Sequence, residues 1–299
     1  MGQARTLDDV APLPEERAGR RASASWLRRL LRSKTAACGL VFVAVTAAAA
    51  LLAPVLAPYN PNALGAGSAA KPSLAHLLGQ DVLGRDQLSR LLFGARTSLT
   101  VGLLSTAIGA ICGVVIGLLA GVSHGLVDAV LMRAMDALLA LPGLLLPLVL
   151  LAGLGSGVTT VSLALGIGLL PVIARLMRAQ ALSVMERDYV LAATSLGAGR
   201  LRIMLQHVAP NCWAPIIVQA SLGMGIAVVG EAALSFLGVG IKPPTSTWGV
   251  MLVEAFSHIR TTPWLAFAPG AAIFLLVLSI NFVGDALRDV LDPRLRGSV

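Results

Sequence analysis

The segment of residues 187–211 carries polar side chains in a pattern suited to binding another protein. It lies between long apolar runs, and its ionisable residues are Arg187, Asp188, Arg200, Arg202 and His207. Apolar residues recur along it at roughly helical spacing, which gives it one apolar side. Glycine is costly inside a helix and tolerated where the backbone turns, so Gly197 and Gly199 predict a division into two short helices. The segment is therefore expected to be a helical hairpin outside the membrane that serves as a docking surface.

The sequence offers no pattern typical of catalysis or of a metal site. Its three lysines, Lys34, Lys71 and Lys242, do not belong to the GxxxxGK[ST] loop that cradles phosphates. The four histidines are scattered without the partner spacing of a metal site or a catalytic base. The three cysteines are isolated and belong to no CxxC motif or Cys/His cluster. We expect no catalytic residue, no metal and no cofactor in this chain.

Composition places the chain in a membrane. Of its 299 residues, 56% are hydrophobic and only 13% are charged. A spanning helix needs about 20 mainly apolar residues. Windows of this kind cover residues 35–60, 97–123, 137–174, 203–230 and 261–284. The third window would be about 57 Å long as one helix, nearly twice the hydrocarbon thickness of about 30 Å, so we expect two helices with a break at residues 153–157.

The predicted fold class is all-α, with six transmembrane helices. Most of the 23 Lys and Arg residues fall on one side of these spans if the N-terminus is cytosolic. The residues on the other side are Lys71, Arg85, Arg90, Arg96, Lys242 and Arg260. Both termini are therefore expected in the cytosol. The net charge of +8 is explained by insertion and lipid headgroups rather than by nucleic acid, since no nucleic-acid motif is present.

The first apolar run has a competing interpretation as a cleaved signal peptide, because it follows a basic region and ends in small residues. Its length and the extended tail before it favour an uncleaved span. Within that tail, apolar residues alternate with arginines and predict a short interfacial helix. The apolar members are Trp26, Leu27, Leu30 and Leu31.

The docking segment also resembles a known family. Its pattern YVxAAxxxG, followed by an isoleucine and Pro-Asn, is similar to the EAA loop of membrane subunits of bacterial ABC importers, in the form of the peptide and nickel branch. Leu191 occupies the place of the family's glutamate. The resemblance implies a coupling helix that sits in a groove of an ATPase subunit. The residues expected to make this contact are Tyr189, Val190, Ala192, Ala193, Gly197, Arg200, Ile203, Pro210 and Asn211.

A second signature precedes the second span. Residues 76–99, HLLGQDVLGRDQLSRLLFGARTSL, are similar to the family's HxLGTDxxGRDxxSRxxxGxRxSL. Glycines allow turns here, and the leucines can lie on the membrane surface with the charged residues in the headgroups. One interpretation is an interfacial structural helix, and the other is a contact with a delivering binding protein. The candidate contact residues are Asp81, Arg85, Asp86 and Arg90.

A third signature, residues 230–252, resembles the family's EAxLSFLGLGxxPPxPSWGxML. Glu231 is expected close to the outer interface, where an ionisable group is either functional or held structurally by neighbouring helices. Trp248 suits an interfacial anchor, and the residues after Pro243 and Pro244 are expected to fold back over the mouth of the pathway. Ser235 and Phe236 are further pathway or gate candidates.

The third span contains Pro142 and Pro147, which free backbone carbonyls and bend a helix. Such a span either lines a pathway, with Pro142 as a candidate, or is a kinked packing helix. Arg133 and Asp136 are three residues apart and can pair. The last signature, residues 281–294, is similar to NxxGDxLRDxLDPR, and we expect a structural role near the ATPase rather than contact with cargo.

The resemblance implies the type I permease fold of ABC importers in a bacterial inner membrane. The implied partners are a second permease, two ATPases that bind ATP and Mg, and an extracytoplasmic binding protein. The implied cargo is di- or oligopeptide, with nickel, glutathione or another small ligand as the alternative. A stand-alone channel or secondary transporter would show midplane ionisable pairs and inverted repeats. A scaffold without transport would leave the docking segment without a purpose.

The expected organisation divides the chain into five parts. Residues 1–35 form a basic cytosolic tail and residues 36–58 the first span. Residues 59–96 are extracytoplasmic. Residues 97–290 form the core of five further spans, with the coupling loop at 186–211, and residues 291–299 are the cytosolic C-terminus.

Overall fold

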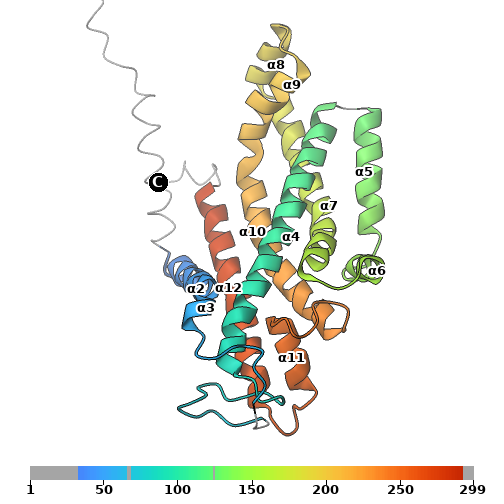
Figure 1. Cartoon of the computed structure of the whole chain (residues 1–299). Coiled ribbons are helices and arrows are strands. Elements are labelled where there is room, and N and C mark those ends of the chain that lie inside the picture. The colour runs from blue at the N-terminus through green and yellow to red at the C-terminus, as the bar shows by residue number, and fades with distance from the viewer. Residues whose placement is uncertain (1–32, 66–68, 124, 292–299) are drawn as a thin grey trace, which may run out of the picture.

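The computed structural model describes residues 33–65, 69–123 and 125–291 of the chain (Figure 1). This part is helical, and its one β-type feature is an isolated bridge between Gln80 and Asp86. Its helices are α2 (Lys34–Leu51), α3 (Ala53–Leu56), α4 (Gln87–Ser123), α5 (Leu126–Leu139), α6 (Leu145–Leu154), α7 (Val158–Met185), α8 (Asp188–Ser195), α9 (Arg200–Arg202), α10 (Ala209–Phe236), α11 (Trp248–Phe256) and α12 (Trp264–Leu291). The predicted all-α class is confirmed. The interfacial helix predicted around Trp26 and the end of the last signature lie outside the described residues.

Five of the described helices are long and apolar enough to cross a membrane. They are α2, α4, α7, the continuous helix Arg200–Phe236 and α12, and α6 is a shorter apolar helix. The break predicted inside the third window is present, since α6 ends at Leu154 and α7 begins at Val158. Gly155 adopts φ +81 there, a backbone conformation that favours glycine.

The third span differs from the expected single kinked helix. It consists of α5 and α6, and α6 does not continue the axis of α5 (Figure 1). Pro142 lies in the connection, where Gly143 adopts φ +28. Pro147 falls in the first turn of α6, where its missing N–H is not needed. The sequence at this point therefore ends one helix and starts another.

Two ion pairs hold α5 against α7. The guanidinium of Arg178 donates to both carboxylate oxygens of Asp128, at 2.5 and 2.6 Å. Arg175 donates to Asp136 further along the same two helices. Asp136 therefore pairs across to α7, and the Arg133–Asp136 pair that the spacing allows is not formed in the described part of the chain. The helix is fixed by contacts between elements, which residue spacing along one helix cannot reveal.

The tightest helix contact joins α4 to α7, and it depends on glycines at every fourth residue of α4. These are Gly109, Gly113, Gly117 and Gly121. A Cβ at Gly117 would lie 2.2 Å from the carbonyl oxygen of Ala174, closer than any real contact. Small residues allow membrane helices to approach closely, which replaces the hydrophobic drive that is missing in lipid.

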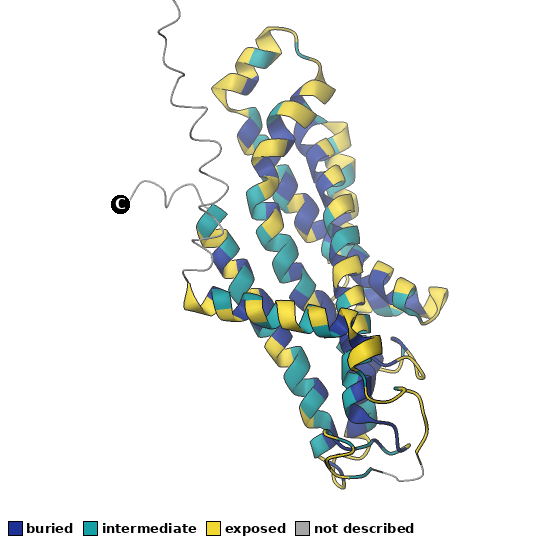
Figure 2. Ribbon diagram, turned by 60° about the vertical axis from the view of Figure 1, so that its left-hand side comes forward, coloured by how far each residue is buried: buried dark blue, intermediate teal, exposed yellow. Residues whose placement is uncertain are grey.

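The helix bundle has two ends that differ in structure. Figure 1 shows α8 and α9 protruding at one end, and α11 with the long connection between α3 and α4 at the other. The protruding end is mostly exposed, whereas the middle of α4, α7 and α10 is largely buried (Figure 2). A buried apolar cluster lies under the protrusion and includes Met177, Val190, Ile203 and Cys212. The hairpin of α8 and α9 is thus packed against the body of the protein through buried apolar side chains.

Candidate functional site

The hairpin formed by α8, α9 and the turn between them has the form predicted for residues 187–211. Helix α8 ends at Ser195, and α9 begins at Arg200. Gly197 between them adopts φ +83, and its N–H donates to the carbonyl of Thr194 at 3.0 Å. The N–H of Ala198 donates to the carbonyl of Ala193 at 3.1 Å, which closes the end of α8.

The side chains of the hairpin divide into an inner and an outer set. Val190 and Ile203 are buried and join the apolar cluster beneath the hairpin, and Ala193 is half-buried. The remaining residues expected at the ATPase contact are exposed: Tyr189, Ala192, Arg200, Pro210 and Asn211, with Gly197 at the turn. Large apolar side chains that face outward beside them are Leu191, Leu196, Leu201 and Leu205, and Leu196 at the tip is 89% exposed.

The second arm of the hairpin widens before it continues into α10. Residues Ile203–Val208 form a π-helical segment between α9 and α10. Pro210 has no N–H to donate into the helix, and a wider turn relieves the clash of its ring with the preceding carbonyls. The amide of Asn211 donates to the carbonyl of His207 at 2.7 Å. The Pro-Asn pair of the signature thus has a local structural role, because it shapes the base of the hairpin.

A buried carboxylate lies at the opposite end of the molecule. Glu231, in α10, is fully buried. Its oxygens accept hydrogen bonds from the hydroxyl of Ser98 on α4, at 3.1 Å, and from that of Ser235, at 2.9 Å. The oxygen of Ser98 also accepts from the backbone N–H of Trp248, at 3.3 Å. The three helices α4, α10 and α11 therefore meet at this carboxylate.

The other two gate candidates, Phe236 and Pro142, do not join these hydrogen bonds. Phe236 is exposed and its ring meets that of Phe256 edge to face, with centroids 5.4 Å apart. Pro142 is exposed on the connection between α5 and α6. The nearby Leu144 packs against the apolar cluster that contains Leu234. The structure thus brings Glu231 and Ser235 into one hydrogen-bonded group and leaves Phe236 and Pro142 at the surface.

Trp248 is not the interfacial anchor that its position suggested. It is buried, and its indole N–H donates to the carbonyl of Leu91 at 3.0 Å. Helix α11 begins beside α4 and packs against α10 and α12, which covers the indole. The residues after Pro244 fold back onto α4, α10 and α12, and this places the tryptophan inside the protein. That they cover the mouth of a pathway stays a prediction.

The segment around Arg90 forms a buried ion cluster. Arg90 is fully buried and donates to Asp81 and Glu254, and Arg85 donates to the same two carboxylates at 2.6 and 2.8 Å. Asp86 accepts from the N–H and hydroxyl of Ser89 and bonds the ring of His76 at 2.9 Å. The cluster ties the long outer connection and α4 to α11.

This burial corrects the prediction for the second signature. Asp81, Arg85, Asp86 and Arg90 are at most 4% exposed, so they offer no surface to a binding protein in this structure. Residues 76–99 are also not a separate interfacial helix, because α4 runs without a break from Gln87 to Ser123. Charged groups are stable inside the protein only when paired, and the pairing partner on α11 was not visible from the signature.

Glu254 is the site residue that sequence reasoning missed. It is the single acidic residue in the apolar helix α11, WGVMLVEAF. An isolated charge in such a helix signals a buried partner. That signal could have singled out Glu254, although it would not have identified Arg85 and Arg90 as its partners.

Comparison with known proteins places these features in a family. Residues 113–297 match the family described as binding-protein-dependent transport system inner membrane component, and residues 23–75 match the N-terminal TM domain of oligopeptide transport permease C. The chain is 49% identical to the dipeptide transport system permease protein DppC of Escherichia coli (strain K12) over 272 residues, which cover 89% of this chain and 91% of that protein. It is 45% identical to the di/tripeptide transport system permease protein DppC of Pseudomonas aeruginosa (strain UCBPP-PA14), with 89% and 90% of the two chains covered. It is 40% identical to the glutathione transport system permease protein GsiD of Escherichia coli O6:K15:H31, with 90% of each chain covered. The chain therefore belongs to the family of binding-protein-dependent transport system inner membrane components, and it is a multi-pass permease of the inner membrane.

Proposed function

We propose that this permease is one of two membrane-spanning subunits of an ATP-driven importer for dipeptides or short oligopeptides. Two relatives at 45% and 49% identity carry dipeptide or di/tripeptide transport in their names, and this supports the cargo class. In this proposal two partner ATPases bind ATP and Mg, and an extracytoplasmic binding protein delivers the peptide. The chain itself supplies half of the pathway and no catalytic group.

The observation that carries the proposal is the exposed apolar tip of the hairpin. Leucines at the end of a protruding helix pair gain nothing from contact with water, and a set of them marks a surface for a protein partner. The inner side chains, Val190 and Ile203, fix the hairpin to the body of the protein. A push on the tip would therefore be transmitted to α7 and α10 rather than absorbed by a loose loop.

The orientation of the chain is part of the proposal. The hairpin end faces the cytosol, together with both termini, and the end with α11 faces outward. Of the six basic residues assigned to the outer side, Arg85 and Arg90 are buried in ion pairs, so the outer surface itself carries few positive charges. The division of the chain into tail, first span, outer segment and core belongs to the same proposal.

The proposed cycle couples the two ends of the chain. Closure of the ATPases on ATP would move the hairpin and shift the permeases between inward and outward openings, a two-state change biased by nucleotide. Glu231 and Ser235 would hold the outer ends of α4, α10 and α11 in one group during this change. Phe236 and Pro142, which are exposed in the isolated chain, would face the pathway or the second permease.

A substitution at Gly197 tests the coupling. Gly197→Val places a β-branched residue at φ +83, which distorts the turn, so peptide uptake is expected to fall to background while the chain remains inserted. Gly199→Val is the matched control, because Gly199 has an ordinary φ of −66 and no atom lies within 4 Å of a Cβ added there. Uptake assays and copurification of the ATPase subunits measure the effect. Wild-type uptake by the Gly197 variant would refute the coupling role.

Glutathione is the second candidate cargo, because a relative at 40% identity carries glutathione transport in its name. Nickel or another small ligand is the remaining alternative. The cargo is tested by purifying the assembled importer with its binding protein and identifying the bound molecule by mass spectrometry. Short peptides are the expected result, and glutathione or a metal complex in their place would change the assignment.

A further inference from the structure

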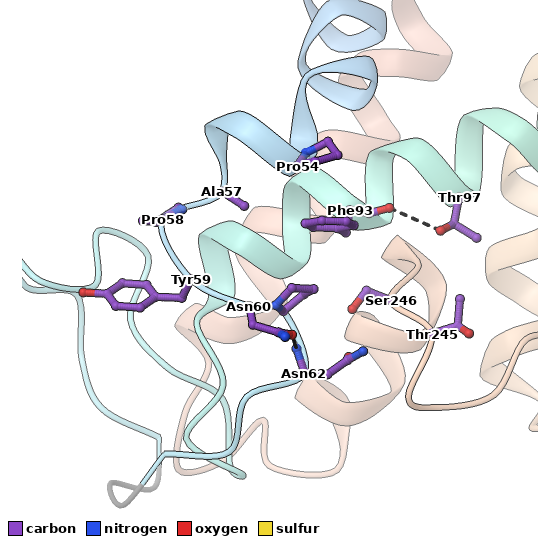
Figure 3. A pocket seen from close by; sticks show the side chains of 11 residues that line it. Pro54, Ala57, Pro58, Tyr59, Asn60, Asn62, Phe93, Thr97, Thr245 and Ser246 are labelled. Carbon is purple, nitrogen blue, oxygen red and sulfur yellow. Dashed lines mark hydrogen bonds between the residues drawn. The ribbon is translucent and has the colours of Figure 1, made fainter.

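A pocket at the outer end of the chain carries an inference that rests on the proposed function. Its volume is about 680 Å³, and three segments form its walls (Figure 3). The first wall is α3 with the chain that follows it, the second is the first part of α4, and the third is the connection before α11. The lining includes Pro54, Pro58, Asn62, Phe93, Thr245 and Ser246.

The walls are fixed in place by hydrogen bonds. The backbone N–H of Tyr59 donates to the hydroxyl oxygen of Ser89 on α4, at 3.1 Å, and that hydroxyl donates to the buried Asp86. Within the first wall, the N–H of Asn62 donates to the side chain of Asn60 at 2.9 Å. The third wall meets α4 where Arg90 donates to Ser246 at 3.4 Å. A hollow with fixed walls binds a partner at little cost in conformational entropy.

The chemistry of the lining is neutral. Proline rings and Phe93 supply apolar surface, and no charged side chain lines the pocket among the described residues. The side chains of Asn62 and Thr245 are exposed and make no hydrogen bond within the described part of the chain. An amide and a hydroxyl of this kind can bond the backbone of an incoming segment in several geometries.

This chemistry decides between three occupants. A free short peptide carries an ammonium and a carboxylate, whose burial requires opposite charges that the lining does not provide. A phospholipid headgroup would be matched by Lys or Arg, which are also missing from the lining. An uncharged protein loop with an apolar tip needs only apolar walls and neutral hydrogen-bonding groups. The segments that line the pocket lie at the end away from the hairpin (Figure 1). In the proposed orientation, a binding protein would arrive at this end.

We infer that this pocket receives an uncharged, apolar-tipped loop of the extracytoplasmic binding protein. The buried ion cluster acts indirectly, because Arg90 and Asp86 hold two of the pocket walls through Ser246 and Ser89. The second signature of the sequence thus serves the binding-protein contact by shaping the pocket rather than by touching the partner.

The test fills the pocket. Asn62→Trp and Thr245→Trp each place a large side chain on an exposed wall position in a different segment. Neither change removes a side-chain hydrogen bond among the described residues. Leu74→Trp is the matched control, because Leu74 is 99% exposed on the outer connection and does not line the pocket. The assembled importer in lipid nanodiscs is titrated with its own purified, fluorescently labelled binding protein, and ATPase activity is recorded with and without it.

We expect both pocket variants to weaken the affinity for the binding protein by about tenfold or more, the effect of losing a central contact, while the basal ATPase activity stays unchanged. Affinities equal to that of the Leu74 variant would overturn the inference. A raised KM for peptide, or loss of bound phospholipid, at unchanged binding-protein affinity would assign the pocket to cargo or lipid and overturn it as well. If the wild-type importer shows no stimulation by the binding protein, the proposed function fails, and this inference fails with it.

Discussion

The close contact between α4 and α7 makes a quantitative prediction for Gly117. We expect Gly117→Ala to destabilise the chain, because its new methyl group would lie 2.2 Å from the carbonyl oxygen of Ala174 and 2.7 Å from the Cβ of Met177. Ordinary contacts begin at 3.4 Å, so the two helices must separate by about 1 Å. The obstacle is backbone, which no change of rotamer can move aside.

The magnitude follows from two opposing effects. Overpacking of a tight contact costs about 1–3 kcal/mol, and a clash with backbone falls at the upper end of that range. Alanine in place of glycine within a helix raises the free energy of unfolding by about 1 kcal/mol, because alanine has the higher helix propensity. The net loss in the free energy of unfolding is therefore about 2 kcal/mol.

The matched control is Gly168→Ala in α7. Nothing lies within 4 Å of a Cβ at Gly168. The same substitution there should therefore raise the free energy of unfolding by about 1 kcal/mol, through helix propensity alone. Unfolding in detergent micelles, followed by circular dichroism, gives both values, and the expected difference between the variants is about 3 kcal/mol. Equal effects of the two substitutions would show that α4 and α7 do not approach each other in this way.

Two further predictions concern buried polar groups at the outer end. Ser98→Ala removes a donor to Glu231 and leaves the N–H of Trp248 unpaired, so it should lower the free energy of unfolding by about 1–3 kcal/mol. Thr100→Ala, on the exposed side of α4, is the control and should change that free energy by no more than about 0.5 kcal/mol. Similar values for both variants would argue against this network. Glu254→Leu leaves two buried arginines with one carboxylate and should cost about 3 kcal/mol or more, while Arg175→Met, in an exposed pair, should cost at most about 1 kcal/mol. The reverse order of these two losses would contradict the burial of the ion cluster.

Much of the architecture could be predicted from local sequence. Hydropathy located the spans, and the length of the third window required a break, which lies between α6 and α7 as expected. The hairpin followed from a polar composition with helical periodicity and from Gly197, which adopts the positive φ that only glycine takes up easily. These features depend on residues that are close together in the sequence, so they can be predicted without knowledge of the tertiary structure.

The packing of the helices could not be predicted in the same way. Glycines in apolar spans are common, and nothing in the sequence says that those of α4, rather than those of α10, face a neighbouring backbone. Pro142 and Pro147 indicated a distortion, but they did not reveal that α5 lies against α7 with Asp128 and Asp136 paired to Arg178 and Arg175. Such contacts join residues that are dozens of positions apart.

The outer end shows most clearly what only tertiary structure decides. The sequence by itself determined that residues 76–99 contain several charged side chains and that Glu231 lies near the end of a span. It left open whether these charged side chains face a partner, a pathway or the protein interior. The fold buries Asp81, Arg85 and Arg90 because α11 brings Glu254 to them across more than 160 positions of sequence. The physical reason is that a charge is stable inside a protein only with a partner, and where that partner lies is a property of the folded chain. Local sequence thus set the helices and their turns, while the exposure of each charged group was set by the way the helices meet.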